Sequence, residues 1–244
     1  MDTIAENLAI KTADGTMSGF AYHPSDDEPH PTVIVLQEIF GVDNHIKDVA
    51  RRFAEEGYYA VAPDLFYREG AGLSGPYEER EEAFRLRATT TPEGSTADLN
   101  ALISHLKGEN GANERIGIVG YCFGGGVVYL ASHAVAGIKA GAIYYGGGIV
   151  PRDDAPPGTP SGLDQASNVA CPIIGFFGED AAGIPPAHVP KIEAALKSAG
   201  KDGEFHIYKG AGHGFFCNDR GSYNKEASDD AWPRTLAFFG KHLG

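Results

Sequence analysis

The chain has 244 residues, 42% hydrophobic and 22% charged, a composition typical of a folded globular protein and not of a disordered one. Its 33 acidic and 20 basic side chains give a formal net charge of −13. A field of that sign repels nucleic acid and anionic membrane surfaces, so we expect neither as a partner.

Cysteine usage and the N-terminal residues indicate the compartment. The three cysteines, Cys122, Cys171 and Cys217, are too few and odd in number for a disulfide framework, which favours a reducing environment. Residues 1–15 contain no apolar segment of the signal-peptide type, and no apolar run approaches the length of a membrane span. We therefore expect a cytoplasmic protein, with one domain over residues 1–244.

The N-terminal half reads as a hairpin followed by alternating strands and helices. The turn signal ADG predicts an antiparallel hairpin, and the continuous apolar run 31–38 predicts a strand buried on both faces. The helix that follows has Asp43 or Asn44 as a candidate cap and Gly57 as its stop. The predicted segments are strands at 7–12, 16–24, 31–38 and 58–65, and helices at 43–57, 77–88 and 94–107.

The C-terminal half continues the alternation. A stretch rich in Pro, Gly and Asp at 147–171 is the longest irregular segment, and Gly200 marks the end of a helix. The predicted segments are strands at 115–122, 138–148 and 172–183, a last strand within 203–216 that runs into a loop with His213, and helices at 123–134, 188–200 and 222–240.

This alternation predicts an α/β fold in which a mostly parallel central sheet has helices on both faces, in three α/β/α layers. Functional sites in such sheets form at the carboxyl ends of the strands. Glu38, Cys122, Asp180 and His213 each follow a predicted strand. These four residues are therefore the first candidates for a site.

The segment Gly120-Tyr121-Cys122-Phe123-Gly124 has the form G-x-C-x-G, which is the nucleophile elbow G-x-S-x-G with sulfur in place of oxygen. Small residues two before and two after the nucleophile let the strand and the following helix approach each other. The N-terminus of that helix favours a thiolate over a thiol. The pattern predicts that Cys122 is a nucleophile, although a free cysteine is also a common packing residue.

The order of the partners strengthens this interpretation. In the α/β-hydrolase fold the nucleophile is followed by an acid and then by a histidine, and here Asp180 and His213 follow Cys122 in that order. We expect Cys122 to attack a carbonyl carbon, His213 to move the proton, and Asp180 to orient the imidazole. Glu179 is the rival acid.

An oxyanion hole is expected from the backbone N–H of Phe123, the residue after the nucleophile, and from the N–H of Ile39. The glycine-rich turn lacks the G-x-G-x-x-G spacing of a dinucleotide site, because position 122 is Cys. The histidines show no metal-ligand spacing either. We therefore expect no organic cofactor and no metal.

The segments QEIFGV, APDLF, GYCFGGG, FFGED and GAGHGFF, taken together and in this order, resemble the dienelactone hydrolase (carboxymethylenebutenolidase) family over roughly residues 5–240. The resemblance implies an α/β-hydrolase fold and a Cys-Asp-His triad at Cys122, Asp180 and His213. It also implies that Glu38 contacts the resting thiol and helps to form the thiolate when substrate arrives.

The resemblance also implies substrate-binding positions, and here the chain departs from the family pattern. Arg80 matches one of two arginines that hold a substrate carboxylate, and Phe84 stands where the family often has Tyr. Cys217 stands where the second Arg is expected, and Gly214 replaces the usual Ser. Arg220, three residues after Cys217, is a possible substitute.

Tyr144 and Tyr145 end a predicted strand and are candidates for lining the pocket, although core aromatic residues are commoner. The function expected is hydrolysis of a small ester or lactone, of the dienelactone type, through a thioester acyl-enzyme, by a monomer or a small homo-oligomer. One alternative is a broad-specificity esterase with another substrate, which the residues at 214 and 217 favour. A non-catalytic small-molecule-binding protein is the alternative from another class.

Overall fold

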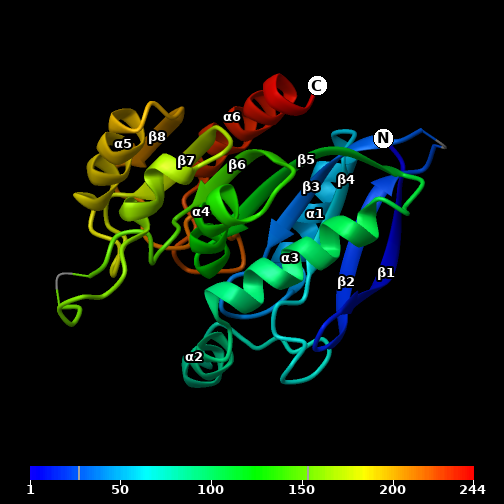
Figure 1. Cartoon of the computed structure of the whole chain (residues 1–244), viewed down its shortest axis with the longest axis horizontal. Coiled ribbons are helices and arrows are strands. Elements are labelled where there is room, and N and C mark those ends of the chain that lie inside the picture. The colour runs from blue at the N-terminus through cyan, green and yellow to red at the C-terminus, as the bar shows by residue number, and fades with distance from the viewer. Residues whose placement is uncertain (27, 153) are drawn as a thin grey trace.

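One eight-stranded sheet forms the centre of the computed structural model, which describes residues 1–26, 28–152 and 154–244 (Figure 1). The strands pair in the order β1-β2-β4-β3-β5-β6-β7-β8; β2 runs antiparallel to both of its neighbours, and the other pairs are parallel. This confirms the predicted α/β fold with a mostly parallel sheet. The strand bounds are β1 Thr3–Thr12, β2 Gly15–Pro24, β3 His30–Leu36, β4 Tyr59–Pro63, β5 Ala112–Tyr121, β6 Ile138–Tyr144, β7 Ile173–Gly178 and β8 Gly203–Tyr208.

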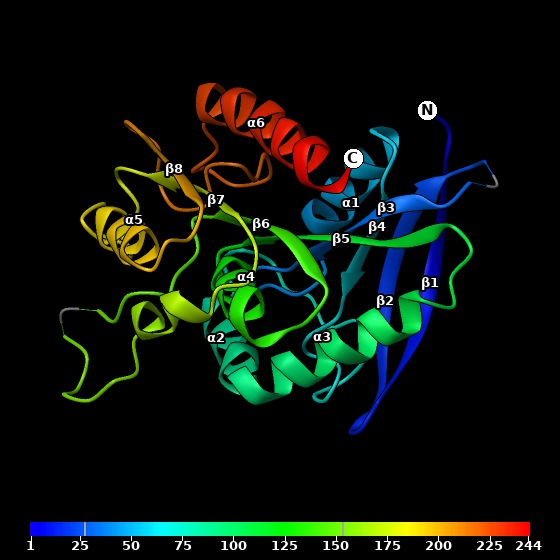
Figure 2. The same cartoon turned by 45° about the horizontal axis from the view of Figure 1, so that its top comes forward.

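Helices cover both faces of the sheet, as Figure 2 shows: α1 and α6 lie on one side, and α3 and α4 lie on the other. The alternation of β3 side chains explains the two layers, because Val33 and Val35 pack with α1 and α6 while Ile34 and Leu36 pack with α3 and α4. The helix bounds are α1 Asn44–Glu55, α2 Arg80–Ala88, α3 Pro92–Leu106, α4 Phe123–Ala134, α5 His188–Ser198 and α6 Lys225–Leu243, with a 3-10 helix, η1, at Gly162–Asn168.

Most of the turn, cap and helix-end residues predicted from the sequence are confirmed. The β1–β2 hairpin closes with Thr12 opposite Gly15, and Asp43 caps α1 by accepting a hydrogen bond from Ile46 N–H at 3.0 Å. Gly57 and Gly200 follow helix ends with φ of 90° and 67°, a conformation that glycine adopts without strain.

Three helices begin elsewhere than predicted. The helix predicted over 222–240 begins at Lys225, where Asn224 caps it by accepting from Ala227 N–H. The helix predicted over 77–88 begins only at Arg80, because Tyr77 donates a hydrogen bond to Asp43 and belongs to the preceding loop. The helix predicted from residue 94 begins at Pro92, where Thr91 caps it by accepting from Gly94 N–H. The irregular segment predicted at 147–171 contains η1, and its residue 153 lies outside the described residues.

Within the described ranges, no helix combines the length and the apolar character that crossing a membrane requires.

The turn between β5 and α4 depends on two glycines. A Cβ added to Gly120 would lie 2.2 Å from the carbonyl oxygen of Gly124, and one added to Gly124 would lie 2.6 Å from the carbonyl oxygens of Leu36 and Gln37. Gly124 N–H also donates to Gln37 O at 3.1 Å, which ties the first turn of α4 to the end of β3. The close approach that the G-x-C-x-G pattern predicts is therefore present.

We expect the Gly120→Ala variant to lose about 3 kcal/mol of unfolding free energy, because its methyl group overlaps backbone atoms that cannot rotate away. The control is Gly240→Ala in α6, where no atom lies within 4 Å of the added Cβ; it should gain about 0.5–1 kcal/mol. Urea denaturation measures both. A Gly120→Ala protein as stable as the native chain would contradict the close approach.

Candidate active site

Cys122 occupies the strained turn at the carboxyl end of β5. Its φ of 53° and ψ of −111° are rare for a residue with a side chain, and α4 begins immediately after it. The backbone N–H groups of Phe123 and Ile39 lie close enough to the sulfur to lower its pKa. The structure thus brings together the candidate nucleophile and the two backbone groups that the sequence names as candidate oxyanion donors.

The thiol of Cys122 is neutral at rest. Burial and the neighbouring negative charge of Glu38 raise its pKa to about 12, although the two N–H groups and Arg220 act in the opposite direction. Attack on a carbonyl carbon requires the thiolate. The site therefore needs a group that takes the proton from the sulfur.

Glu38 is a candidate acceptor for that proton, because its carboxylate acts electrostatically on the thiol. Its side chain is 1% exposed and pairs with the guanidinium of Arg220, Nη1 to Oε2, at 3.0 Å. Burial raises the pKa of Glu38 to about 7, and Arg220 partly offsets this. A carboxylate with that pKa can accept and release a proton near neutral pH.

Arg220 reaches Glu38 because residue 214 is glycine. Gly214 has a φ of 81°, and an added Cβ would lie 2.4 Å from Nη1 and 2.7 Å from Cζ of Arg220. The guanidinium also lies over the rings of Phe40 and Tyr77, at 5.6 and 5.5 Å from their centroids. The glycine at 214 and the arginine at 220 are therefore parts of one arrangement.

The loop that supplies Ile39 is held in place from outside. Phe40 O accepts a hydrogen bond from Gly75 N–H at 3.2 Å, and the ring of Tyr77 meets the ring of Phe40 edge to face at 4.9 Å. Gly41 has no room for a side chain, because an added Cβ would lie 2.1 Å from the carbonyl oxygen of Leu73. The segment before α2 thus fixes the oxyanion loop.

His213 follows β8 and contacts the ring of Tyr145 edge to face at 5.2 Å. Burial, together with the positive charges of Arg220 and Arg80, lowers the pKa of His213 to about 4. The imidazole is therefore neutral at pH 7 and can accept a proton. Its Nδ1 is buried and has no hydrogen-bond partner among the described residues.

Asp180 does not contact His213 in this structure. It follows β7 with an exposed side chain, and no hydrogen bond between the two residues occurs within the described ranges. Their backbones are nevertheless neighbours, because Asp180 N–H donates to Ala211 O at 3.0 Å. An added Cβ on Gly178 would lie 2.3 Å from that same oxygen, so the two loops approach closely. Glu179 is exposed as well.

Tyr145 belongs to the site, whereas Tyr144 does not. Tyr144 is fully buried, and its hydroxyl bonds to that of Thr235 on α6 at 2.7 Å, so it is a core residue rather than a pocket residue. Tyr145 has a φ of 40°, and its ring lies against His213 with its hydroxyl beside Glu38. No sequence signal separates the two tyrosines, because the strained backbone that turns Tyr145 toward the site appears only in the fold.

Cys217 lies beside the site but is closed off from solvent. Its side chain is buried, and its Sγ donates to the hydroxyl of Tyr77 at 3.3 Å. Tyr77 in turn donates to Asp43 at 2.8 Å. Burial raises the pKa of Cys217 to about 11. The thiol therefore supports Tyr77, and it does not offer a charge to substrate.

The substrate-binding residues expected on α2 are exposed. Phe84 is 59% exposed, and Arg80 acts electrostatically on His213. Beside the site, residues 146–152 and 154–160 and the start of α5 line a groove of about 470 Å³ at the carboxyl end of β6. The structure therefore places a helix face and a groove near the candidate nucleophile.

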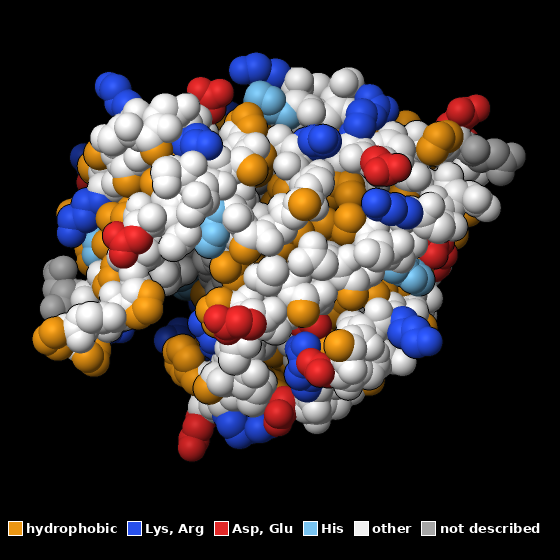
Figure 3. All heavy atoms as spheres, in the orientation of Figure 1, with side chains coloured by type: hydrophobic (Ala, Val, Ile, Leu, Met, Phe, Trp, Pro, Cys, Tyr) orange, Lys and Arg blue, Asp and Glu red, His pale blue; other side chains and the backbone are white. Residues whose placement is uncertain are grey.

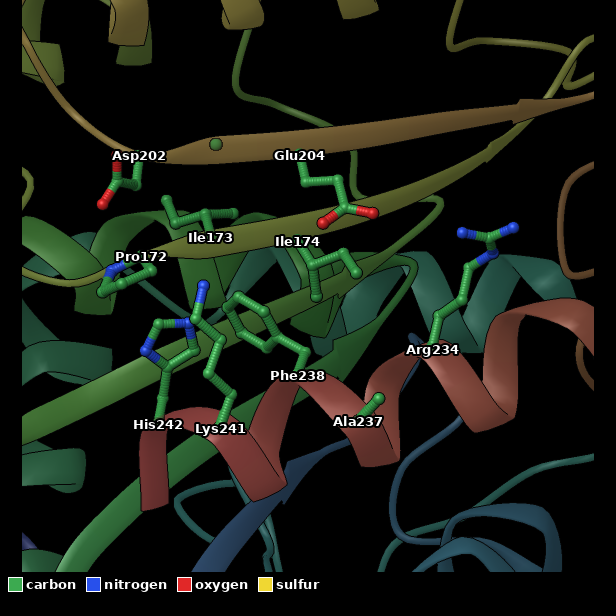
Figure 4. A pocket seen from close by; sticks show the side chains of 11 residues that line it. Pro172, Ile173, Ile174, Asp202, Glu204, Arg234, Ala237, Phe238, Lys241 and His242 are labelled. Carbon is green, nitrogen blue, oxygen red and sulfur yellow. The ribbon is translucent and has the colours of Figure 1, made fainter. Parts of the chain in front are cut away.

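A second groove, of about 510 Å³, lies at the opposite edge of the sheet, where β7 and β8 begin (Figure 4). Arg234 and Lys241 of α6 face the acidic residues Asp202 and Glu204 across it. Parallel sheets place their functional residues at the carboxyl ends of the strands, and this groove lies at their other ends.

The surface carries no concentration of one charge on the face seen in Figure 3, where acidic and basic side chains are interspersed among the described residues. No group of three or more His, Cys, Asp or Glu that could hold a metal ion occurs within the described parts of the chain.

Comparison with known proteins agrees with the fold and with the resemblance. Residues 17–243 match the model of the dienelactone hydrolase family. Two curated relatives bear the name "Putative carboxymethylenebutenolidase": one from Methylorubrum extorquens, 34% identical over 98% of this chain and 81% of its own length, and one from Synechocystis, 37% identical over 93% and 92%. A crystal structure titled as a "Putative Dienelactone Hydrolase" from Klebsiella pneumoniae superposes with a TM-score of 0.88 at 31% identity, covering 99% of this chain and 100% of that one.

We expect Glu38→Gln to lower the pKa of Cys122, because the variant removes a negative charge beside the sulfur and leaves the positive charge of Arg220 unopposed. The rate of iodoacetamide alkylation at pH 8 should rise by about tenfold. Peptide mass spectrometry assigns the modified cysteine, and the exposed Glu179→Gln variant is the control. Unchanged or slower alkylation of Cys122 would contradict the electrostatic account.

Proposed function

The chain belongs to the dienelactone hydrolase family, and from that premise we propose that it opens a dienelactone-type (carboxymethylenebutenolide) lactone through a thioester on Cys122. The family and the relatives show that the chain is a carboxymethylenebutenolidase-like ester or lactone hydrolase. The substrate and the thioester mechanism are what we propose. The observation that carries the finer proposal is the position of Cys122, in a strained turn with two N–H donors aimed at its sulfur.

Glu38 takes the proton from the thiol. It is buried beside Cys122, and its pKa of about 7 makes it a much better proton acceptor than an ordinary carboxylate. A substrate anion that draws Arg220 away would raise the pKa of Glu38 further, because Arg220 stabilises the charged form. Binding of an anionic substrate and formation of the thiolate are then coupled.

The thiolate attacks the carbonyl carbon, and the N–H groups of Ile39 and Phe123 stabilise the negative charge on its oxygen. Collapse of the tetrahedral intermediate breaks the C–O bond, and the leaving oxygen takes up the proton that Glu38 accepted from the thiol. In a lactone the leaving group stays attached to the acyl chain, so only water has to enter for the second step.

His213 serves the second step. Its imidazole is neutral at pH 7 and takes a proton from the attacking water, which hydrolyses the thioester and releases Cys122. Asp180 orients the ring once its exposed carboxylate turns toward the unpartnered Nδ1 of His213. The backbone hydrogen bond from Asp180 to Ala211 keeps the two loops adjacent.

A broad-specificity esterase is the second candidate, and a specific observation favours it. The residue expected to be the second substrate-binding Arg is Cys217, which is buried and bonded to Tyr77, and Arg220 is engaged with Glu38. The carboxylate-binding pair of the family pattern is thus rearranged in this chain. A substrate without a carboxylate would need neither arginine.

We expect Cys122→Ala to lower kcat/KM by at least about 10³-fold on a carboxylated dienelactone and on a neutral short-chain aryl ester, because both require the nucleophile. The control is Cys171→Ala, at a buried cysteine of the hydrophobic core just before β7. Turnover near the native rate in Cys122→Ala would refute the mechanism. Preference of the native enzyme for the neutral ester would leave the mechanism intact and support the second candidate.

The acid is tested by exchanging each of two neighbouring carboxylates for its amide. Asp180→Asn should reduce kcat by about 10²–10⁴-fold, because the imidazole loses its orientation and the stabilisation of its charged form. Glu179→Gln, equally exposed in the structure, should retain kcat within about twofold. Steady-state kinetics on the neutral ester measures both, and a reversed pattern would transfer the role to Glu179.

A further inference from the structure

The groove of about 470 Å³ at the carboxyl end of β6 starts from the two loops that carry Tyr145 and Asp180. One wall begins at Gly146, the residue after Tyr145, whose ring lies against His213. The other wall includes Gly183, in the loop that carries Asp180 and follows β7. Both walls of the groove therefore extend directly from loops that hold candidate site residues.

The backbone that lines this groove packs on the first turn of α4, which begins directly after Cys122. An added Cβ on Gly125 would lie 2.6 Å from the Cα of Gly146. One on Gly126 would lie 2.3 Å from the carbonyl oxygen of Gly147. Because these backbones touch without intervening side chains, the groove begins beside the turn that holds the candidate nucleophile.

The inner lining of the groove is aliphatic. Ile149, Ile184 and Ile192 line it and belong to the buried hydrophobic core. Arg152 and Asp154 also line it, but their side chains are exposed and pair with each other at 2.9 Å. An ionic group placed against the three isoleucines would lose its hydration without gaining a partner. The chemistry of the lining therefore suits an uncharged hydrocarbon group.

Glycines keep the groove open. Gly146, Gly147 and Gly148 line it in succession and contribute no side chain to it. A Cβ added to Gly147 would lie 3.7 and 3.9 Å from Cδ1 and Cγ1 of Ile184, which are ordinary contact distances. A side chain at position 147 would therefore fill part of the groove without overlapping backbone.

We propose that this groove is a specificity subsite that binds an uncharged hydrocarbon chain or ring of an ester substrate, in its acyl part or its alcohol part. The inference rests on the proposed function, because it presumes that the ester is attacked at Cys122. The substrate class it adds is an ester with an extended apolar group. Such a group would contribute to binding in proportion to the apolar area that the groove removes from water.

The test measures how kcat/KM depends on chain length in two series of esters. The acyl series is 4-nitrophenyl acetate and 4-nitrophenyl hexanoate, and the alcohol series is ethyl acetate and hexyl acetate. Each value is divided by the rate of hydroxide hydrolysis of the same ester, which removes differences in intrinsic reactivity. In one series the native enzyme should prefer the longer ester by about 10- to 100-fold, because each buried methylene contributes up to about fourfold.

Gly147→Leu should lower that preference by about tenfold or more, mainly through KM of the longer ester, because the added side chain occupies the groove. Gly147→Ala adds only a methyl group and should lower the preference by a smaller factor. The matched control is Gly240→Leu on α6, where no atom lies within 4 Å of the added Cβ. The control should leave the preference unchanged.

The series in which Gly147→Leu acts shows whether the acyl part or the alcohol part of the ester lies in the groove. Absence of a preference for the longer ester in both series would overturn the inference. A preference that survives Gly147→Leu would overturn it as well. Equal losses on the short and the long ester belong to this second result, because they would show that the substitution only disturbs the adjacent turn of α4.

A binding measurement separates this inference from the proposed function. Binding of 1-hexanol to the Cys122→Ala protein, followed by NMR chemical shifts, needs no turnover. Gly147→Leu in that background should weaken the binding by about tenfold. Unchanged binding, or no binding to either protein, would overturn the inference. If instead Cys122→Ala still hydrolyses 4-nitrophenyl acetate at the native rate, the proposed mechanism fails whatever the hexanol result.

Discussion

The strained turn at Cys122 is the constraint on which the rest of the site depends. A non-glycine residue holds a φ of 53° only because β5 and α4 approach closely around it, where Gly120 and Gly124 leave no room for a side chain. The same approach places the sulfur at the N-terminus of α4 and within reach of the Ile39 and Phe123 N–H groups. One backbone geometry therefore positions both the proposed nucleophile and the proposed oxyanion donors, whereas the surrounding side chains set the pKa of the thiol.

Electrostatics around the sulfur favours the protonated thiol at rest. The buried Glu38 carboxylate opposes a second negative charge beside it, and Arg220 offsets only part of that effect. Arg220 occupies the space that a side chain at position 214 would fill. The glycine at 214 is therefore what allows Arg220 to lie beside Glu38. This link explains how a chain with Cys217 in place of the expected arginine still brings a guanidinium to Glu38.

The sequence was sufficient for the fold and for the backbone of the site, because apolar periodicity, turn residues and the rule that parallel strands end at one edge are local or topological. The strand-end rule placed Glu38 and Cys122 at one edge of the sheet, and the catalytic roles of these two residues stay predictions. The sequence could not predict which arginine meets Glu38 or which of two adjacent tyrosines faces the site, since both depend on loop paths and on the strained φ of Tyr145. Tyr144 was wrong as a pocket residue because its hydroxyl turns to Thr235 on α6. The contact between Asp180 and His213 stays a prediction.

The most direct test of the central claim is intact-protein mass spectrometry of the native enzyme, acid-quenched while it turns over a carboxylated dienelactone. Because the leaving group of a lactone remains on the acyl chain, a thioester adds the whole mass of the lactone. The account predicts a hydroxylamine-labile adduct of that mass on the peptide that contains Cys122. Hydrolysis that continues at the native rate with the Cys122 thiol irreversibly alkylated would contradict it.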